Sequence, residues 1–168
     1  CSSIFLIFFL RIASCFFDKI VDGLFNFKDA SGDKFNVSFN DFLSVIKSQN
    51  RRDRDVHWRN QSDFLHYEKY DDYFSLESFV KAIQSLDKRG FIVHDTRSVL
   101  NHDASSMNRV EGDFSKMKEI EIKKMKEEGI LPSYKSMFTQ SEIELVNDIY
   151  KDDIDLYKTQ FGEKNLLF

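Results

Sequence analysis

An apolar run at residues 4–10, which stops at Arg11, constrains the fold of this chain more than any other feature. The run is far shorter than the roughly 20 apolar residues that a transmembrane helix requires, so it is not a membrane span. Residues 4–9 have the length and composition of a strand buried on both faces, which is typical of a parallel sheet covered by helices. The sequence therefore predicts a central strand at residues 4–9.

A different hydrophobic period follows the run directly. From residue 12 onward, apolar side chains recur every four positions, while acidic and basic side chains occupy the opposite face, as in a helix that packs on a core. A buried strand that leads into such a helix predicts an α/β fold. The predicted core stripe consists of Ile12, Phe16, Ile20 and Leu24, widened by Phe17 and Val21.

The rest of the chain adds a second predicted strand, at residues 70–76, and several amphipathic helices. These helices are predicted at 39–46, 79–86, 114–128 and, after a capping box at 139–142, up to about residue 157. Residues 49–63 are strongly polar and lack a sustained period, so they are predicted to form a long loop. With 168 residues, no repeat and no internal linker, the chain is expected to form one domain over 1–168.

Charge and composition exclude several classes of function. A net charge of −4 provides no global positive field, which argues against a general nucleic-acid binder. Two cysteines and four dispersed histidines give neither a disulfide framework nor a metal-ligand spacing, so no metal site is predicted. No glycine-rich phosphate loop is found. No secretory signal is found and cysteines are few, which makes the cytoplasm the default compartment.

Arg11 and Ser14 lie where the predicted strand turns into the predicted helix. Ligands of open α/β sheets bind at the carboxyl ends of strands, and the start of a helix favours an anion. A guanidinium and a hydroxyl suit a phosphate group there. On spacing alone, the alternative is a solvent-exposed arginine beside an ordinary serine near a helix start.

Residues 51–61 form a second candidate site, because they combine cations with His57 and Trp58. An imidazole titrates near neutral pH and an indole can stack on a sugar ring, so this basic loop suits an anionic or carbohydrate-like ligand. The alternative is a solvated loop that Trp58 anchors to the core. A third candidate, Tyr70 and Asp71 followed by Glu77, is equally explained by an acidic residue that favours a helix dipole.

Taken in order, these segments resemble the carbohydrate-type sulfotransferases, which move a sulfuryl group from the nucleotide PAPS to a hydroxyl. Arg11 and Ser14 match the end of that family's R-D/N-P-x-x-R-x-x-S motif, whereas its first Arg and its Pro fall on Leu6 and Phe8. The remaining matches are His57, Trp58 and Gln61, then Tyr70, Asp71 and Glu77, and finally Ile149-Tyr-Lys-Asp152 with Phe161-Gly162.

The resemblance implies a three-layer α/β/α fold like that of the P-loop NTPases, incomplete at its N-terminus and mostly helical in this part. The family's 5′-phosphosulfate loop has no counterpart here, so the chain resembles the C-terminal part of the domain. We therefore expect a fragment or a degenerate copy that is inactive by itself. The compartment would be the Golgi lumen if the chain is a piece of a eukaryotic enzyme.

The resemblance also implies roles for individual residues. Arg11 and Ser14 would hold the 3′-phosphate of PAPS or of the product PAP, and His57 is the candidate base, with substrate positioning as its alternative role. No metal is implied. An acceptor glycan, or another molecule with a hydroxyl group, would face Arg51, Arg52, Arg54, Trp58 and Gln61.

Two other functions remain open from the sequence. The first is a noncatalytic binding or interaction module that presents the basic loop, residues 51–61, to an anionic partner. The second is a plain helical scaffold. Binding of PAP distinguishes the enzyme lineage from the interaction module, and strand content distinguishes both from the scaffold.

Overall fold

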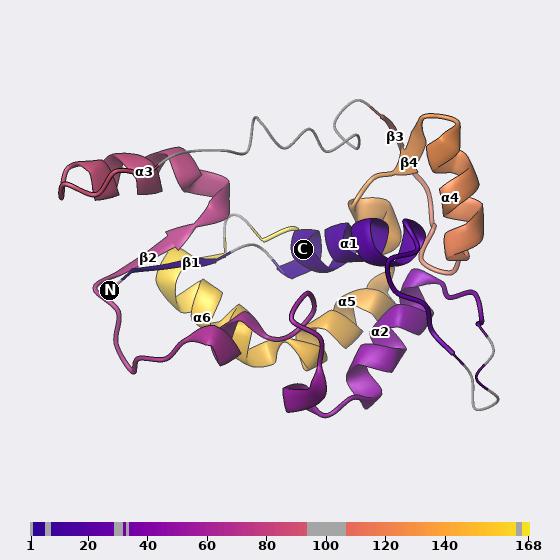
Figure 1. Cartoon of the computed structure of the whole chain (residues 1–168), viewed down its shortest axis with the longest axis horizontal. Helices are drawn as coiled ribbons and strands as arrows, with labels where there is room; N and C mark the ends of the chain where they lie inside the picture. Colours follow the sequence, from indigo (N-terminus) through magenta and orange to yellow (C-terminus); the bar gives the residue numbers. More distant parts are fainter. Residues whose placement is uncertain (1, 6–7, 29–31, 33, 94–106, 164–165) are drawn as a thin grey trace.

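Helices and two short parallel sheets make up the structure, a computed structural model (Figure 1). It describes residues 2–5, 8–28, 32, 34–93, 107–163 and 166–168. In Figure 1, helix α1, Phe8–Cys15, lies between two groups of elements. One group contains β1, Ser2–Phe5, β2, Asp72–Ser75, and α3, Phe79–Asp87, and the other contains β3, Asn108–Val110, β4, Ile130–Pro132, and α4, Glu119–Glu127.

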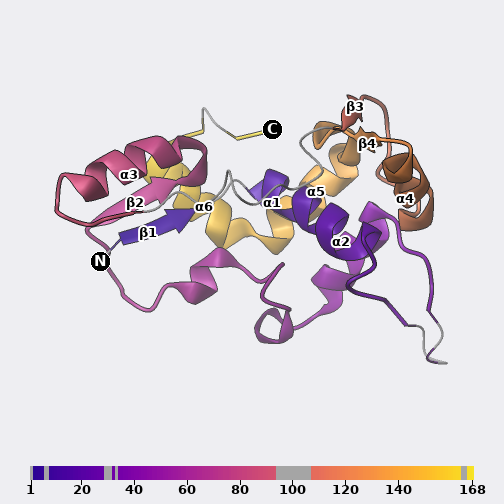
Figure 2. The same cartoon turned by 45° about the horizontal axis from the view of Figure 1, so that its top comes forward.

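The first sheet joins segments that are distant in the sequence. Strand β1, Ser2–Phe5, pairs in parallel with β2, Asp72–Ser75, and α3, Phe79–Asp87, follows directly after a short 3₁₀ turn (Figure 2). The second sheet pairs β3, Asn108–Val110, in parallel with β4, Ile130–Pro132. Parallel strands combined with helices agree with the predicted mixed α/β class, while the three-layer arrangement of the P-loop enzymes stays a prediction.

The predicted C-terminal boundary of the strand at residues 4–9 is wrong. Strand β1 ends at Phe5, and helix α1, Phe8–Cys15, has already begun at Phe8. An uninterrupted apolar run fits a buried strand and a buried helix equally well, because hydrophobic period alone does not separate the two. Arg11 therefore lies within α1 rather than at the junction between a strand and a helix.

Helix α1 continues into a π-helical segment, η1, at Phe16–Val21. A π-helix inserts an extra residue into each turn, and here it directs two adjacent pairs of apolar side chains, Phe16 with Phe17 and Ile20 with Val21, into the core. Leu24, the last member of the predicted stripe, is 66% exposed. The prediction fails there because the helix ends at Val21, and Gly23 then turns the chain with a φ of 76°.

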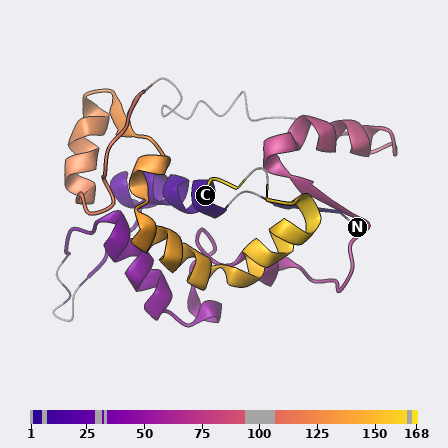
Figure 3. The same cartoon turned by 180° about the vertical axis from the view of Figure 1, so that it is seen from behind.

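The core is aromatic and lies between α1 with η1 and four further helices: α2, Phe39–Ser48; α4, Glu119–Glu127; α5, Gln140–Ile149; and α6, Lys151–Phe161. The ring of Phe16 contacts Phe39 and Phe42, and Phe138 packs edge-on against Phe9 and Phe39. The capping box predicted at Thr139 is present, and Ser38 forms another at the start of α2. Helices α5 and α6 follow each other end to end (Figure 3).

Residues 49–63 form a loop, as predicted, with two short 3₁₀ turns at Arg51–Asp53 and Gln61–Phe64. Two further 3₁₀ turns occur at Leu76–Ser78 and Lys135–Met137. Helix α4 begins at Glu119, later than the predicted start at residue 114, because residues 114–118 bond to other segments, for example Phe114 to Ser136 and Lys118 to Ser38. Within the described residues, every helix is too short or too polar to cross a membrane.

Candidate functional site

The side chain of Arg11 connects helix α1 to the basic loop. Its Nη2 donates hydrogen bonds to the backbone carbonyls of His57, at 3.2 Å, and of Val56, at 3.4 Å. Arg11 of the predicted phosphate site and the predicted His-Trp segment are therefore brought together in space.

A cavity of about 170 Å³ lies beside this contact. Residues 11, 14, 15, 18 and 19 face it from α1 and η1, because positions three and four apart share one face of a helix. The cavity brings together three residues that the sequence singles out, Arg11, Ser14 and His57. Its full lining is Arg11, Ser14, Cys15, Asp18, Lys19 and His57.

Two cations, one carboxylate and a hydroxyl thus surround a small space. The lining residues carry one more positive than negative charge, which suits an anionic group such as a phosphate, while the nearby Asp55 carboxylate is taken up by His57. Burial raises the pKa of the Cys15 thiol to about 12, although Arg11 acts in the opposite direction. The thiol is therefore a neutral part of the wall at physiological pH.

His57 is held by Asp55. Oδ1 of Asp55 lies 2.6 Å from Nδ1 of the ring and accepts the backbone N–H of His57 at 2.9 Å. Burial pushes the pKa of Asp55 upward, but the hydrogen bonds from the backbone and ring of His57 outweigh it and keep the pKa below its ordinary value. A charged Asp55 stabilises a proton on Nδ1, which leaves Nε2 of His57 to accept a proton from a substrate.

Trp58 lies in the core. It is 4% exposed, its ring packs edge-on against Phe25 and Phe42, and its Nε1 donates a hydrogen bond to Gln49 at 3.1 Å. Its backbone carbonyl accepts the hydroxyl of Tyr150 at 2.7 Å. This placement matches the alternative in which Trp58 anchors the loop, and it does not support stacking of this indole on a sugar.

The arginines of the basic loop differ in their placement. Arg51 donates to Asp63 at 2.8 Å and also to Asp152, while the buried Arg54 donates to Asn60 at 2.8 Å. Arg52, by contrast, is exposed. Since Arg51 and Arg54 bond within the protein, the loop is not a broad cationic surface, and an interaction module built on it is not favoured.

Asp153 holds the far end of the basic loop, a role that the sequence analysis missed. It is fully buried and accepts the backbone N–H groups of Gln61, at 2.8 Å, and of Ser62, at 2.9 Å. Burial raises the pKa of Asp153, although these hydrogen bonds act in the opposite direction. Helical spacing could have revealed that Asp153 is buried, because it lies four positions before Tyr157 on the same face of α6.

The structure adds little support for the third candidate site, which consists of Tyr70, Asp71 and Glu77. The hydroxyl of Tyr70 accepts the backbone N–H of His66 at 3.0 Å, and Asp71 is exposed. The side chain of Glu77 lies outside what the structure describes. Among the described residues, no three His, Cys, Asp or Glu side chains gather in a way that could hold a metal ion.

Comparison with known proteins gives one match. A family model with the description "Sulfotransferase family" covers residues 9–160, which include the cavity, the basic loop and Asp153. The match begins just after Leu6 and Phe8, where the motif and this chain differ. No curated protein and no solved structure matches the chain.

Proposed function

Because the chain belongs to the sulfotransferase family, we propose that it binds the 3′-phosphate of PAPS, or of the product PAP, in the cavity beside Arg11. We further propose that the reaction it serves is the transfer of a sulfuryl group to a hydroxyl of a carbohydrate-like acceptor. The observation that carries the proposal is the shared cavity of Arg11, Ser14 and His57, which brings together residues from two separate motifs of the sequence.

The chemistry of the cavity supports a phosphate end rather than a whole nucleotide. About 170 Å³ is below the roughly 300–1,000 Å³ of ordinary small-molecule sites, so the rest of the donor would extend outside this space. A guanidinium carries five N–H donors, and both bonds that Arg11 makes with described residues come from Nη2. The other N–H groups, together with the Ser14 hydroxyl and Lys19, can therefore address phosphate oxygens.

We propose His57 as the base of this reaction. PAPS, when bound, supplies the activated sulfuryl group. Nε2 of His57 would take the proton from the acceptor hydroxyl, and the charge of Asp55 would stabilise the resulting imidazolium. Arg11 and Lys19 would stabilise negative charge at the phosphate end.

The acceptor side of the proposal rests on fewer residues than the sequence singles out. Arg52 is exposed and free of the core, so we assign it to direct contact with the acceptor. Arg51, Arg54, Trp58 and Gln61 would act by holding the loop in place, since their bonds and packing lie within the protein.

Calorimetry with PAP tests the donor site. The wild-type chain should bind PAP, and Arg11→Ala should lose that binding while keeping its circular dichroism spectrum. Lys124→Ala, an exposed lysine of α4, serves as the matched control and should bind PAP like the wild type. A well-folded wild-type chain that binds no PAP would contradict the proposal.

A further inference from the structure

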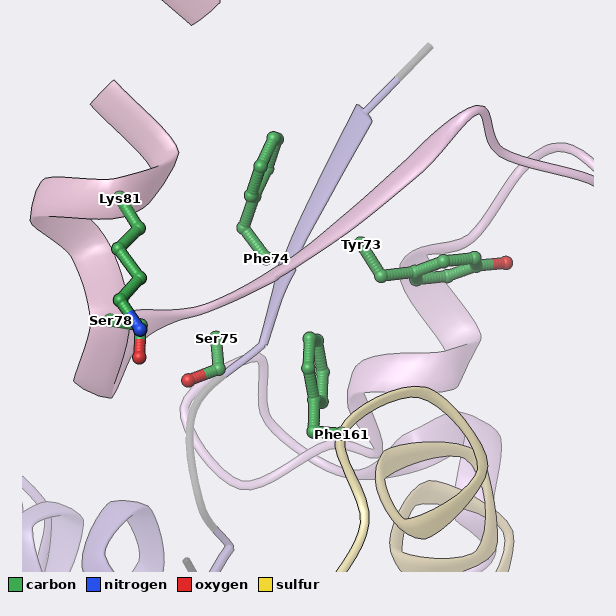
Figure 4. A pocket seen from close by; sticks show the side chains of 6 residues that line it. All are labelled: Tyr73, Phe74, Ser75, Ser78, Lys81 and Phe161. Atoms are coloured by element: carbon green, nitrogen blue, oxygen red, sulfur yellow. The ribbon is translucent and has the colours of Figure 1, made fainter. Parts of the chain in front are cut away.

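A second cavity, of about 280 Å³, lies at the carboxyl end of β2, where the chain turns into α3 (Figure 4). Ligands of parallel α/β sheets bind at this end of the strands. The cavity shares no lining residue with the one beside Arg11. Its lining consists of Tyr73, Phe74, Ser75, Ser78, Lys81 and Phe161.

Ser75 is the feature of this cavity that the fold does not explain. The residue is 5% exposed, and its hydroxyl has no hydrogen-bond partner in the part of the chain that the structure describes. Buried polar groups are nearly always hydrogen-bonded, because leaving one unpaired costs its full hydration. An unpaired hydroxyl in the lining of a cavity therefore indicates a ligand atom that accepts its hydrogen bond.

Among the six residues that line the cavity, Lys81 alone is charged. Helix α3 begins at Phe79 with no acidic residue in its first turn, and Lys81 lies in that turn instead. A lysine is unfavourable at the positive end of a helix dipole, so Lys81 strengthens a field that attracts an anion. Figure 4 shows the amine of Lys81 and the hydroxyls of Ser75 and Ser78 on the same side of the strand.

Aromatic rings complete the cavity. In Figure 4 the ring of Phe161 stands beside Ser75, between it and Tyr73. Such a wall suits the flat, apolar body of a ring compound, while the serines and Lys81 suit an oxyanion attached to it. A free inorganic ion would use only the polar half of this cavity.

We propose that this cavity binds a phosphate or sulfate monoester of a ring compound. The oxyanion is held by Lys81, Ser75 and Ser78, and the ring lies against Phe161 and Tyr73. The site is separate from the proposed donor site, and it does not depend on the binding of PAP beside Arg11.

Titration of the full chain with phenyl phosphate and, separately, phenyl sulfate tests this site by calorimetry. At least one ester should bind, and which one binds identifies the oxyanion. Lys81→Ala should weaken that binding at least tenfold, while Lys88→Ala, an exposed lysine at the other end of α3, should leave it unchanged. Inorganic sulfate should bind at least tenfold more weakly than the ester.

Ser75→Ala separates a ligand role from a structural one. Because the hydroxyl lacks a partner in the described residues, its removal should leave the melting temperature unchanged or raise it, while binding of the ester weakens. Three results would overturn the proposal: no binding of either ester, equal binding by Lys81→Ala and wild type, or displacement of the ester by PAP. Displacement by PAP would place the cavity within the donor site. Loss of PAP binding alone, for instance in Arg11→Ala, would leave this site intact.

Discussion

Arg11 donates hydrogen bonds from helix α1 to the backbone carbonyls of Val56 and His57, which lie 45 and 46 positions further along the chain. This contact does more than place a cation near a histidine. It ties the backbone of the basic loop to the helix, so the orientation of His57 depends on a residue of a different motif.

Arg11→Lys should weaken PAP binding by about tenfold or more, although it keeps the positive charge. A charge-assisted hydrogen bond contributes about 1.5–3 kcal/mol. Lysine lacks the planar guanidinium of arginine, so its single ammonium group cannot bond two loop carbonyls and a phosphate at once. Calorimetry with PAP measures the effect, and hydrogen exchange of residues 55–58 should become faster in the same variant. Wild-type affinity in Arg11→Lys would show that charge alone suffices.

Asp153→Ala should lower the free energy of unfolding by about 3 kcal/mol, because each buried donor left without a partner costs about 1–3 kcal/mol. The donors that lose their acceptor are the backbone N–H groups of Gln61 and Ser62 and the hydroxyl of Ser62. Urea unfolding provides the measurement. Asp152→Ala is the matched control: its exposed carboxylate pairs with Arg51, so its removal should cost no more than about 1 kcal/mol. Equal effects of the two substitutions would contradict the role of Asp153.

Glu142 should make the fold sensitive to acid. Burial pushes the pKa of Glu142 upward, but hydrogen bonds from Thr139 and Asn40 outweigh it and lower the pKa. A carboxylate whose pKa is lower in the folded state contributes stability above its unfolded pKa of about 4.3, and this contribution disappears as the pH falls through the folded value. Urea midpoints between pH 3 and pH 7 should therefore fall toward low pH.

Glu142→Gln should flatten part of this pH dependence and cost about 1 kcal/mol at pH 7 through the loss of the capping interaction. Glu144→Gln, an exposed position of the same helix, should leave both the stability and its pH dependence close to those of the wild type. An unchanged acid slope in Glu142→Gln would rule out this carboxylate as the source.

Cys15 should resist alkylation in the folded chain. Burial raises the pKa of its thiol to about 12, so the reactive thiolate is scarce at pH 8. Treatment with iodoacetamide, followed by mass spectrometry of the peptide that contains Cys15, should show slow modification in buffer and fast modification in urea. Fast modification in buffer would indicate that α1 opens readily.

Much of the local structure could be predicted from the sequence, because helical spacing and capping residues act over a few positions. The helix beginning at Phe39, the capping box at Thr139 and the second strand are examples. The start of α1 could not be predicted, since an apolar run such as residues 4–10 fits both kinds of element. Placement of the site residues depended on tertiary contacts. Nothing local in the sequence distinguishes the buried Trp58 from a stacking platform.

The parallel pairing of β1 with β2 has a consequence for folding kinetics. Its register joins Ser2 to Asp72, so the loop from residue 2 to residue 72 must close before the first strand has a partner. Closing so large a loop costs entropy early and returns stabilising contacts only late, which slows folding. We expect contacts between elements that are neighbours in the sequence, such as the consecutive helices α5 and α6, to form before this sheet. Until then, the apolar start of the chain is exposed to other molecules, and aggregation competes with folding at that stage.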